Sequence, residues 1–497
     1  MGQSFRSIRT GVRTHNYTIL IKYPNTGAPT PDDINIMVMS WRNPRATKIP
    51  IDEDFMSISD NPMSGASIAQ ISRWLRICIY SHAACWTRRE MTTRVEARPP
   101  TRLIDLHDQH TNMWNIIVTA SPSRNYIYVA LSHRWTSAVP KLTRKNFSLF
   151  EAGQPDNVLP LDYQHVISLC RTLSIRYVWV DSLCIIQDSP EDFQHEAATM
   201  ADVYSGALLT ISICWPSQSG CMPIRDPSSF MPKVLSPKNR GFQEAVALLV
   251  NESDFGRDVL YSPVNSRGWV LQERVLSPRV LYLTKEQFYW ECNNVIACEV
   301  HPNGIPILNS KEYHRRINVT HHAPGESKID TWSRVISVYT RSSLTFHKDK
   351  FVALSGVARQ MASLDGDEYI AGLWKSSLLL DLLWSPISSN MAKQRDCYAP
   401  SWSWASMLGE VDTHCTLLVS DYEVREFTTF SIHGTKPLAL VQNTFVLPRG
   451  PDRFGDITDA RIDVKCLVIP MTIDKCSDKI SFQRLPTENN PNWRSRK

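Results

Sequence analysis

The sequence predicts an α/β protein in which a mainly parallel sheet is flanked by helices and followed by a mixed α+β region. The main observation is that three apolar runs of strand length occur, at 126–132 (YIYVALS), 177–180 (YVWV) and 207–213 (ALLTISI). Amphipathic helical patterns separate them, at 159–174 and 190–204. Short connections between alternating strands and helices favour right-handed crossovers, which place the strands parallel in one sheet.

Length and composition are those of a soluble globular protein. The chain has 497 residues, of which 42% are hydrophobic and 21% charged, and this length allows two or three domains. No apolar run approaches the roughly 20 residues of a membrane-spanning helix. The net charge of +5 is spread along the chain, which argues against nucleic acid as a partner. Twelve scattered cysteines do not resemble a disulfide framework, so we expect reduced thiols and a cytoplasmic location.

The segment 176–204 combines a strand, an acidic loop and a helix. Its strand ends at Asp181, and Ser189 and Pro190 supply the cap and the first-turn proline of the helix. Glu196 lies at the border of the apolar stripe, where it can face a cleft while the helix stays packed. A solvated acidic helix fits the same pattern. No Lys or Arg occurs from 177 to 224, where the acids are Asp181, Asp188, Glu191, Asp192, Glu196 and Asp202.

Polar residues follow two of the predicted strands directly. The first strand leads into 132–135 (SHRW), and the second leads into the acidic loop 181–188. In parallel sheets of this kind, ligands bind at the carboxyl ends of the strands. The sequence therefore predicts a site at this edge. P-loop, GxGxxG, GxSxG and HExxH motifs are absent, so the chain has no recognisable nucleotide-hydrolysing motif.

Cysteine and histidine recur on one face of a helix predicted over 66–86. Cys78, His82 and Cys85 are residue types that bind zinc, but the sequence identifies no fourth ligand. A packed apolar face with buried thiols is favoured instead, and we assign no metal site from the sequence. Cys184 is interpreted as another buried thiol, because no base histidine is identified beside it.

The rest of the chain is divided by its composition. Polar, turn-rich stretches indicate the ends and the linker, and apolar periodicity indicates the folded regions. The predicted division is a poorly ordered leader at 1–70, a helical and strand extension at 71–125, the main domain at 126–295, a linker at 296–328, a mixed α+β region at 329–473 and a disordered tail at 474–497.

Three blocks resemble the fungal heterokaryon incompatibility (HET) domain. They are YVALSHRW at 128–135, the long block at 159–212 (LPLDYQH to ALLTIS), and RGWVLQERVLSPRVLYL at 267–283, followed by WEC. WLRICIYSHAAC and PTRLIDL before these blocks, and APSWSWAS after them, are similar to the usual companions of this domain. Thr136 stands where the family typically has Gly, which permits backbone conformations that Thr does not adopt cheaply, and Phe193 stands where it has an indole.

The resemblance implies a cytoplasmic fungal protein of non-self recognition and programmed cell death that acts through protein partners or self-association. HET domains are similar to TIR domains, which have a flavodoxin-like sheet and in several cases cleave NAD⁺ with a glutamate. Two hypotheses follow. The first is a non-enzymatic or partner-activated effector. The alternative is a TIR-like NAD⁺ glycohydrolase, with NAD as its substrate and no assigned cofactor.

For the enzymatic alternative, Glu196 is the candidate carboxylate that stabilises the cationic ribose, and Asp181 is the candidate that orients a hydroxyl. An acidic cleft suits both the cationic nicotinamide and an oxocarbenium-like transition state. If Arg267 and Arg274 pair with these two acids, the enzymatic hypothesis weakens. A purely structural role is an equally good interpretation of Gln272 and Glu273. The candidate pocket comprises Ser132, His133, Trp135, Asp188, Arg267, Gln272, Glu273 and Arg274.

Overall fold

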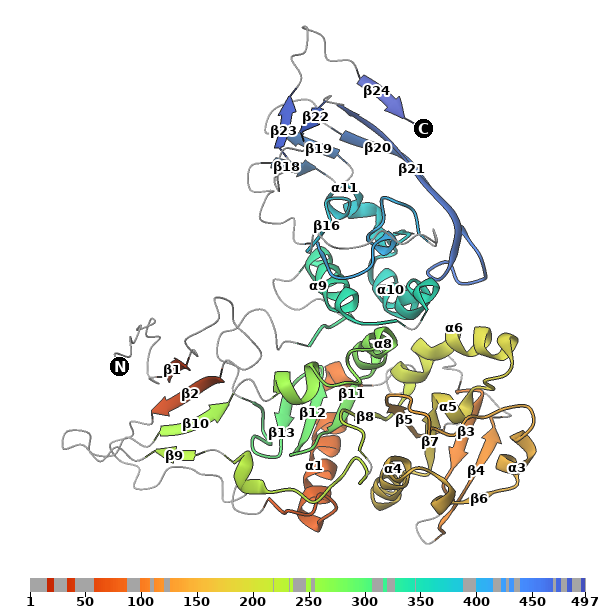
Figure 1. Ribbon diagram of the computed structural model, residues 1–497, viewed down its shortest axis with the longest axis vertical. Helices are drawn as coiled ribbons and strands as arrows, with labels where there is room; N and C mark the ends of the chain where they lie inside the picture. Colours follow the sequence, from red (N-terminus) through yellow and green to blue (C-terminus); the bar gives the residue numbers. More distant parts are fainter. Residues whose placement is uncertain are drawn as a thin grey trace, which may run out of the picture. The chain divides into compact units, whose positions relative to one another are not determined.

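The chain forms two compact units, Met1–Arg316 and Ile317–Lys497, in a computed structural model (Figure 1). Most of the predicted leader, tail and linker lies outside the residues that the structure describes. No helix among these residues combines the length and the apolar character that a membrane crossing requires. The described residues are 16–21, 34–40, 58–86, 99–107, 111–119, 126–217, 219–231, 233–235, 247–251, 255–305, 316–319, 327–344, 346–387, 399–413, 422–425, 429–432, 439–467, 471–474, 481–484 and 493–496.

The first unit is built on a nine-stranded mixed sheet. The order of its described strands is β13-β12-β11-β8-β5-β7-β3-β4-β6. Every residue of the central strands is buried, as expected for strands covered on both faces. The strands are β3 (Arg102–Asp105), β4 (Met113–Val118), β5 (Tyr128–Ser132), β6 (Gln154–Pro155), β7 (Tyr177–Val180), β8 (Leu209–Ile213), β11 (Arg279–Leu283), β12 (Phe288–Cys292) and β13 (Ile296–Cys298).

Only the centre of this sheet is parallel. β5 pairs in parallel with β7 and β8, and β8 pairs in parallel with β11. The flanking strands β3 and β12 pair antiparallel with β7 and β11. The sequence predicts a mainly parallel sheet, whereas the structure has a mixed one. A short connection explains part of the difference: only residues 284–287 join β11 to β12, and a loop of this length joins antiparallel strands.

Helices connect and flank the parallel strands (Figure 1). α6 (Pro190–Gly206) begins as predicted, because the side chain of Ser189 accepts a hydrogen bond from the backbone N–H of Asp192. α1 (Gly65–Ser81) ends earlier than predicted, and the short 3₁₀ turn η2 (Ala83–Cys85) follows it. The other helical segments of this unit are α3 (Phe147–Glu151), η3 (Asp156–Val158), α4 (Leu161–Thr172), α5 (Asp181–Cys184), η4 (Pro227–Ser229), the π-helical η5 (Gly256–Leu260) and α8 (Gly268–Leu276).

A small antiparallel sheet also belongs to the first unit, and only the backbone of its strands is described. Its order is β1-β2-β10-β9. The bounds are β1 (Asn16–Ile21), β2 (Ile34–Ser40), β9 (Lys233–Leu235) and β10 (Ala247–Asn251).

The second unit combines helices with antiparallel strands. Its core includes Trp404, which packs edge to face against Tyr339 and donates a hydrogen bond to the carbonyl of Gly372 at 2.8 Å. Its helical segments are α9 (Lys328–Arg341), η6 (His347–Asp349), α10 (Val352–Asp365), η7 (Lys375–Ser377), α11 (Leu378–Asp381) and η8 (Trp404–Ser406). Its strands are β14 (Tyr369–Ile370), β15 (Leu373–Trp374), β16 (Ser385–Pro386), β17 (Val411–Asp412), β18 (Tyr422–Arg425), β19 (Thr429–Ile432), β20 (Ala439–Pro448), β21 (Ile457–Leu467), β22 (Met471–Asp474), β23 (Ser481–Arg484) and β24 (Trp493–Arg496).

Candidate functional site

The carboxyl ends of β5 and β7 bring three of the predicted site residues together. Asp181 is the first residue of α5, directly after β7. Its Oδ2 accepts a hydrogen bond from Nε1 of Trp135 at 2.9 Å, and its Oδ1 lies 3.8 Å from Nδ1 of His133. The predicted convergence of the polar residues after these two strands is therefore present in the fold.

His133 is held between Asp181 and a tyrosine. Its Nε2 lies 2.6 Å from the hydroxyl of Tyr163 on α4, which in turn lies 3.1 Å from Oγ of Ser182. Burial lowers the pKa of His133, although the charge of Asp181 opposes this shift. A neutral imidazole is therefore favoured. It contacts Tyr163 of α4 through Nε2, whereas its Nδ1 has no hydrogen-bond partner among the described residues.

Glu273 of α8 is a second carboxyl group near this cluster. Burial raises the pKa of Glu273 to about 7, although the charge of Arg267 acts in the opposite direction. The hydroxyls of Ser132 and Tyr204 lie close enough to lower this pKa as well. Neither Glu273 Oε2 nor Ser132 Oγ makes a hydrogen bond of standard geometry within the described part of the chain. A carboxyl group with this pKa exchanges a proton readily near neutral pH.

Arg267 belongs to this cluster, whereas Arg274 does not. Arg267, the residue before α8, donates a hydrogen bond from Nη1 to the carbonyl oxygen of His133. Arg274 instead donates from Nε and Nη2 to the two carboxylate oxygens of Glu291, at 2.8 Å each. Neither arginine forms an ion pair with Asp181 or Glu196 among the residues described, so the neutralisation considered from the sequence does not occur.

Glu196 does not face a cleft, because its side chain is completely buried. Its Oε1 lies 3.7 Å from Nη1 of Arg102 on β3, and that arginine also binds Asp192 and the carbonyl of Cys184. Burial raises the pKa of Glu196. No hydrogen bond or ion pair in the described ranges joins Glu196 to Asp181. The charged neighbour of Glu196 is therefore Arg102, which comes from an antiparallel strand that the sequence did not place beside β7.

Other candidates have local roles. Asp188 is exposed, and its Oδ1 accepts a hydrogen bond from the backbone N–H of Arg144 at 2.9 Å. Gln272 is buried on α8, and its Nε2 has no hydrogen-bond partner among the described residues. Burial raises the pKa of Cys184 to about 12, which agrees with a buried thiol. Thr136 is exposed and does not have a positive φ, so its backbone does not require glycine.

Sequence reasoning missed three hydroxyl groups and one cation of this region. Tyr163 and Tyr204 lie within the two amphipathic helical patterns, and no feature of those patterns distinguishes them as polar site residues. A buried tyrosine hydroxyl normally has a polar partner, and this general rule is the one signal that favoured them. Ser182 and Arg102 had no distinguishing signal, because their importance depends on which elements become neighbours.

Residues 128–273 match the family model described as Heterokaryon incompatibility protein (HET). The chain carries a HET domain. This domain extends from β5 to Glu273 of α8, so it contains Ser132, Asp181 and Glu273, whereas Arg274 lies beyond the matched range. The HET domain implies a part in heterokaryon incompatibility. No curated protein and no solved structure matches the chain.

Proposed function

We propose that the protein acts in fungal non-self recognition and programmed cell death as a partner-activated effector. The HET domain supports the biological role, and the closed site supports the mode of action. The exposed fractions of Ser132, His133 and Glu273 are only 2%, 4% and 2%. A ligand reaches these groups only after the surrounding elements move. Binding of a protein partner, or self-association, would supply the free energy for such a movement.

Regulated expression in a fungal host tests the effector hypothesis. Growth arrest is expected to persist in Glu273→Gln, because an effector without chemistry does not need the carboxylate. Glu196→Gln is the matched control, since it makes the same change at a buried carboxyl group outside the cluster. Loss of growth arrest in Glu273→Gln alone, with both variants folded by circular dichroism, contradicts the non-enzymatic form of the proposal.

The topology of the parallel strands favours the TIR-like alternative. Numbered in chain order, β5, β7, β8 and β11 lie in the order 2-1-3-4, which is the flavodoxin-like arrangement. In that arrangement ligands bind outside the carboxyl ends of strands 1 and 3, where the order reverses. Ser132 ends strand 1. In this alternative the nucleotide site lies beside Ser132.

Glu273 is the best candidate carboxylate for NAD⁺ cleavage, in place of Glu196. The reaction breaks the bond between ribose C1′ and the nicotinamide nitrogen. Water adds to C1′, and the products are nicotinamide, ADP-ribose and a proton. An ionised Glu273 would stabilise the oxocarbenium-like ribose, as carboxylates do in glycoside hydrolysis. Its environment of hydroxyls and a single nearby arginine contrasts with the bidentate pairing of Glu291 with Arg274.

The enzymatic alternative is tested with purified full-length protein and NAD⁺, followed by detection of nicotinamide. The assay is run at low and high protein concentration, because self-association is one way to open the site. Turnover that disappears in Glu273→Gln and persists in Glu196→Gln supports the alternative. Absence of nicotinamide in every condition, or equal turnover in both variants, rules out the assigned role of Glu273.

A further inference from the structure

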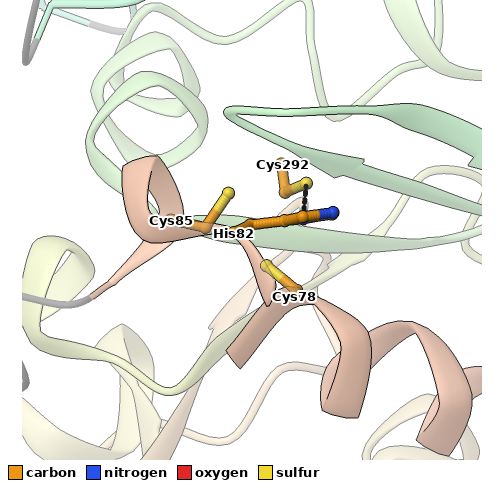
Figure 2. A group of neighbouring side chains, drawn as sticks. All are labelled: Cys78, His82, Cys85 and Cys292. Carbon is orange, nitrogen blue, oxygen red and sulfur yellow. Dashed lines mark hydrogen bonds between the residues drawn. The ribbon is translucent and has the colours of Figure 1, made fainter. Parts of the chain in front are cut away.

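Three cysteines and a histidine converge away from the candidate site (Figure 2). Cys78 lies in the last turn of α1, His82 is the residue at which that helix ends, and Cys85 closes η2. Cys292 is the last residue of β12, in the WEC block. One ligand atom from each residue lies within 4.8 Å of all the others. Two distant parts of the sequence thus supply one cluster.

The size of the cluster is close to that of a tetrahedral zinc shell. With Zn–S bonds of about 2.3 Å and a Zn–N bond of about 2.0 Å, neighbouring ligand atoms lie roughly 3.5–3.8 Å apart. Nδ1 of His82 lies 3.6 Å from Sγ of Cys292. Figure 2 shows the three sulfur atoms and the imidazole ring arranged around a common space. The ligand atoms of the cluster, all within 4.8 Å of one another, thus approach the spacing of such a shell.

A buried cation lies directly beside the cluster. Arg279 of β11 is fully buried and faces Cys292 across the β11–β12 pair. Its Nε donates a hydrogen bond to Sγ of Cys78 at 3.3 Å, and its Nη2 donates to the carbonyl of Cys85. Zinc bound by three thiolates and a neutral imidazole has a net charge of −1. The guanidinium group offsets this charge, and hydrogen bonds of this kind orient and stabilise ligands.

We propose that Cys78, His82, Cys85 and Cys292 bind one structural Zn²⁺ ion that joins the end of α1 to β12. Four protein ligands form a closed shell, which is typical of structural rather than catalytic zinc. The early end of α1 contributes, because the 3₁₀ turn η2 carries Cys85 off the helix. All four residues lie outside the range of the HET match, so the match does not imply this site, and it is independent of the proposed function. The sequence pattern identified three of these residues, and the fold identifies Cys292 as the fourth.

Metal analysis of the full chain is the primary test. Protein expressed with added zinc and purified without chelator is expected to contain about one zinc per chain by inductively coupled plasma mass spectrometry. Cys292→Ser and Cys78→Ser are expected to lower zinc affinity at least about tenfold. Cys221→Ser is the matched control: Cys221 is as buried as Cys292, and its thiol donates to the carbonyl of Asp162, a bond that serine can keep. This control is expected to retain its zinc.

Cobalt(II) gives a second readout that does not depend on the variants. Replacement of zinc by cobalt is expected to produce thiolate-to-cobalt charge-transfer absorption and the d–d bands of tetrahedral cobalt. Chelation is also expected to lower the Tm of the wild type and of Cys221→Ser. A wild type that binds neither metal overturns the proposal. So does a disulfide among Cys78, Cys85 and Cys292 in protein purified under reducing conditions, or full zinc content in Cys292→Ser.

Discussion

Two buried glutamates of the first unit, Glu273 and Glu291, have opposite shifts in pKa. Burial opposes ionisation of both. For Glu291 the charge of Arg274 overcomes burial and lowers the pKa to about 2. For Glu273 burial dominates and raises the pKa to about 7, because Arg267 makes no bidentate pair with it. A buried carboxylate with a bidentate arginine partner stabilises the fold in its ionised form. A buried carboxyl group without such a partner can exchange its proton, so it is available for chemistry or regulation.

The largest expected effect is the loss of stability when Glu291 loses its arginine partner. Arg274→Met removes the bidentate charged partner and its two hydrogen bonds from a completely buried carboxylate, which keeps the hydrogen bond from the hydroxyl of Tyr282. We expect a loss of about 3–5 kcal/mol in the free energy of unfolding. Urea denaturation at neutral pH measures it. Arg144→Met is the control: Arg144 pairs with Glu191 at the surface, where water and salt screen the charges, so this variant is expected to lose far less stability. Equal losses in the two variants contradict the assignment of Glu291 as a paired structural acid.

The raised pKa of Glu273 is tested by measuring the free energy of unfolding as a function of pH. The pKa of Glu273 is raised in the folded state, so its favourable contribution is present below about pH 4.5 and is lost as the pH rises through about 7. Glu273→Gln removes this dependence. We expect the free energy of unfolding of the variant, relative to that of the wild type, to be about 3 kcal/mol higher well above pH 7 than at acidic pH. Urea denaturation across this range measures it, and a constant difference between the two proteins contradicts the raised pKa.

Glu291 provides the opposite control for that titration. Its lowered pKa means that its stabilising contribution is present above about pH 4.5 and is lost as the pH falls through about 2. Glu291→Gln is therefore expected to be destabilised at neutral pH and to approach the wild type in acid. If the stabilities of both glutamine variants, relative to the wild type, change in the same direction as the pH rises, the opposite pKa shifts assigned to the two acids are wrong.

The smallest effect concerns Asp181, a third acid with intermediate exposure. Trp135→Phe removes the hydrogen bond from Nε1 to Oδ2, and we expect a loss of about 1 kcal/mol, since the side chain of Asp181 is 15% exposed and water can replace the donor. Thermal unfolding measures the change. A loss as large as that of Arg274→Met would show that Asp181 depends on Trp135 as completely as Glu291 depends on Arg274.

Local patterns in the sequence were sufficient for the elements at the centre of the domain. The apolar runs predicted β5, β7 and β8, and the cap at Ser189 predicted the start of α6. The convergence of His133, Trp135 and Asp181 followed from the rule that parallel strands present their carboxyl ends at one edge. The HET resemblance came from the same blocks, and the family match agrees with it.

The sequence by itself thus determined the parallel core, the HET domain and the edge of the sheet that carries the polar cluster. Only the tertiary structure decided which charges meet: Arg102 with Glu196, Arg274 with Glu291, and Cys292 with the end of α1. The physical reason is that helical and strand periodicity depend on residues a few positions apart. Pairing of buried polar groups depends on which distant elements become neighbours. Here antiparallel β3 supplies Arg102, and antiparallel β12 supplies Glu291 and Cys292.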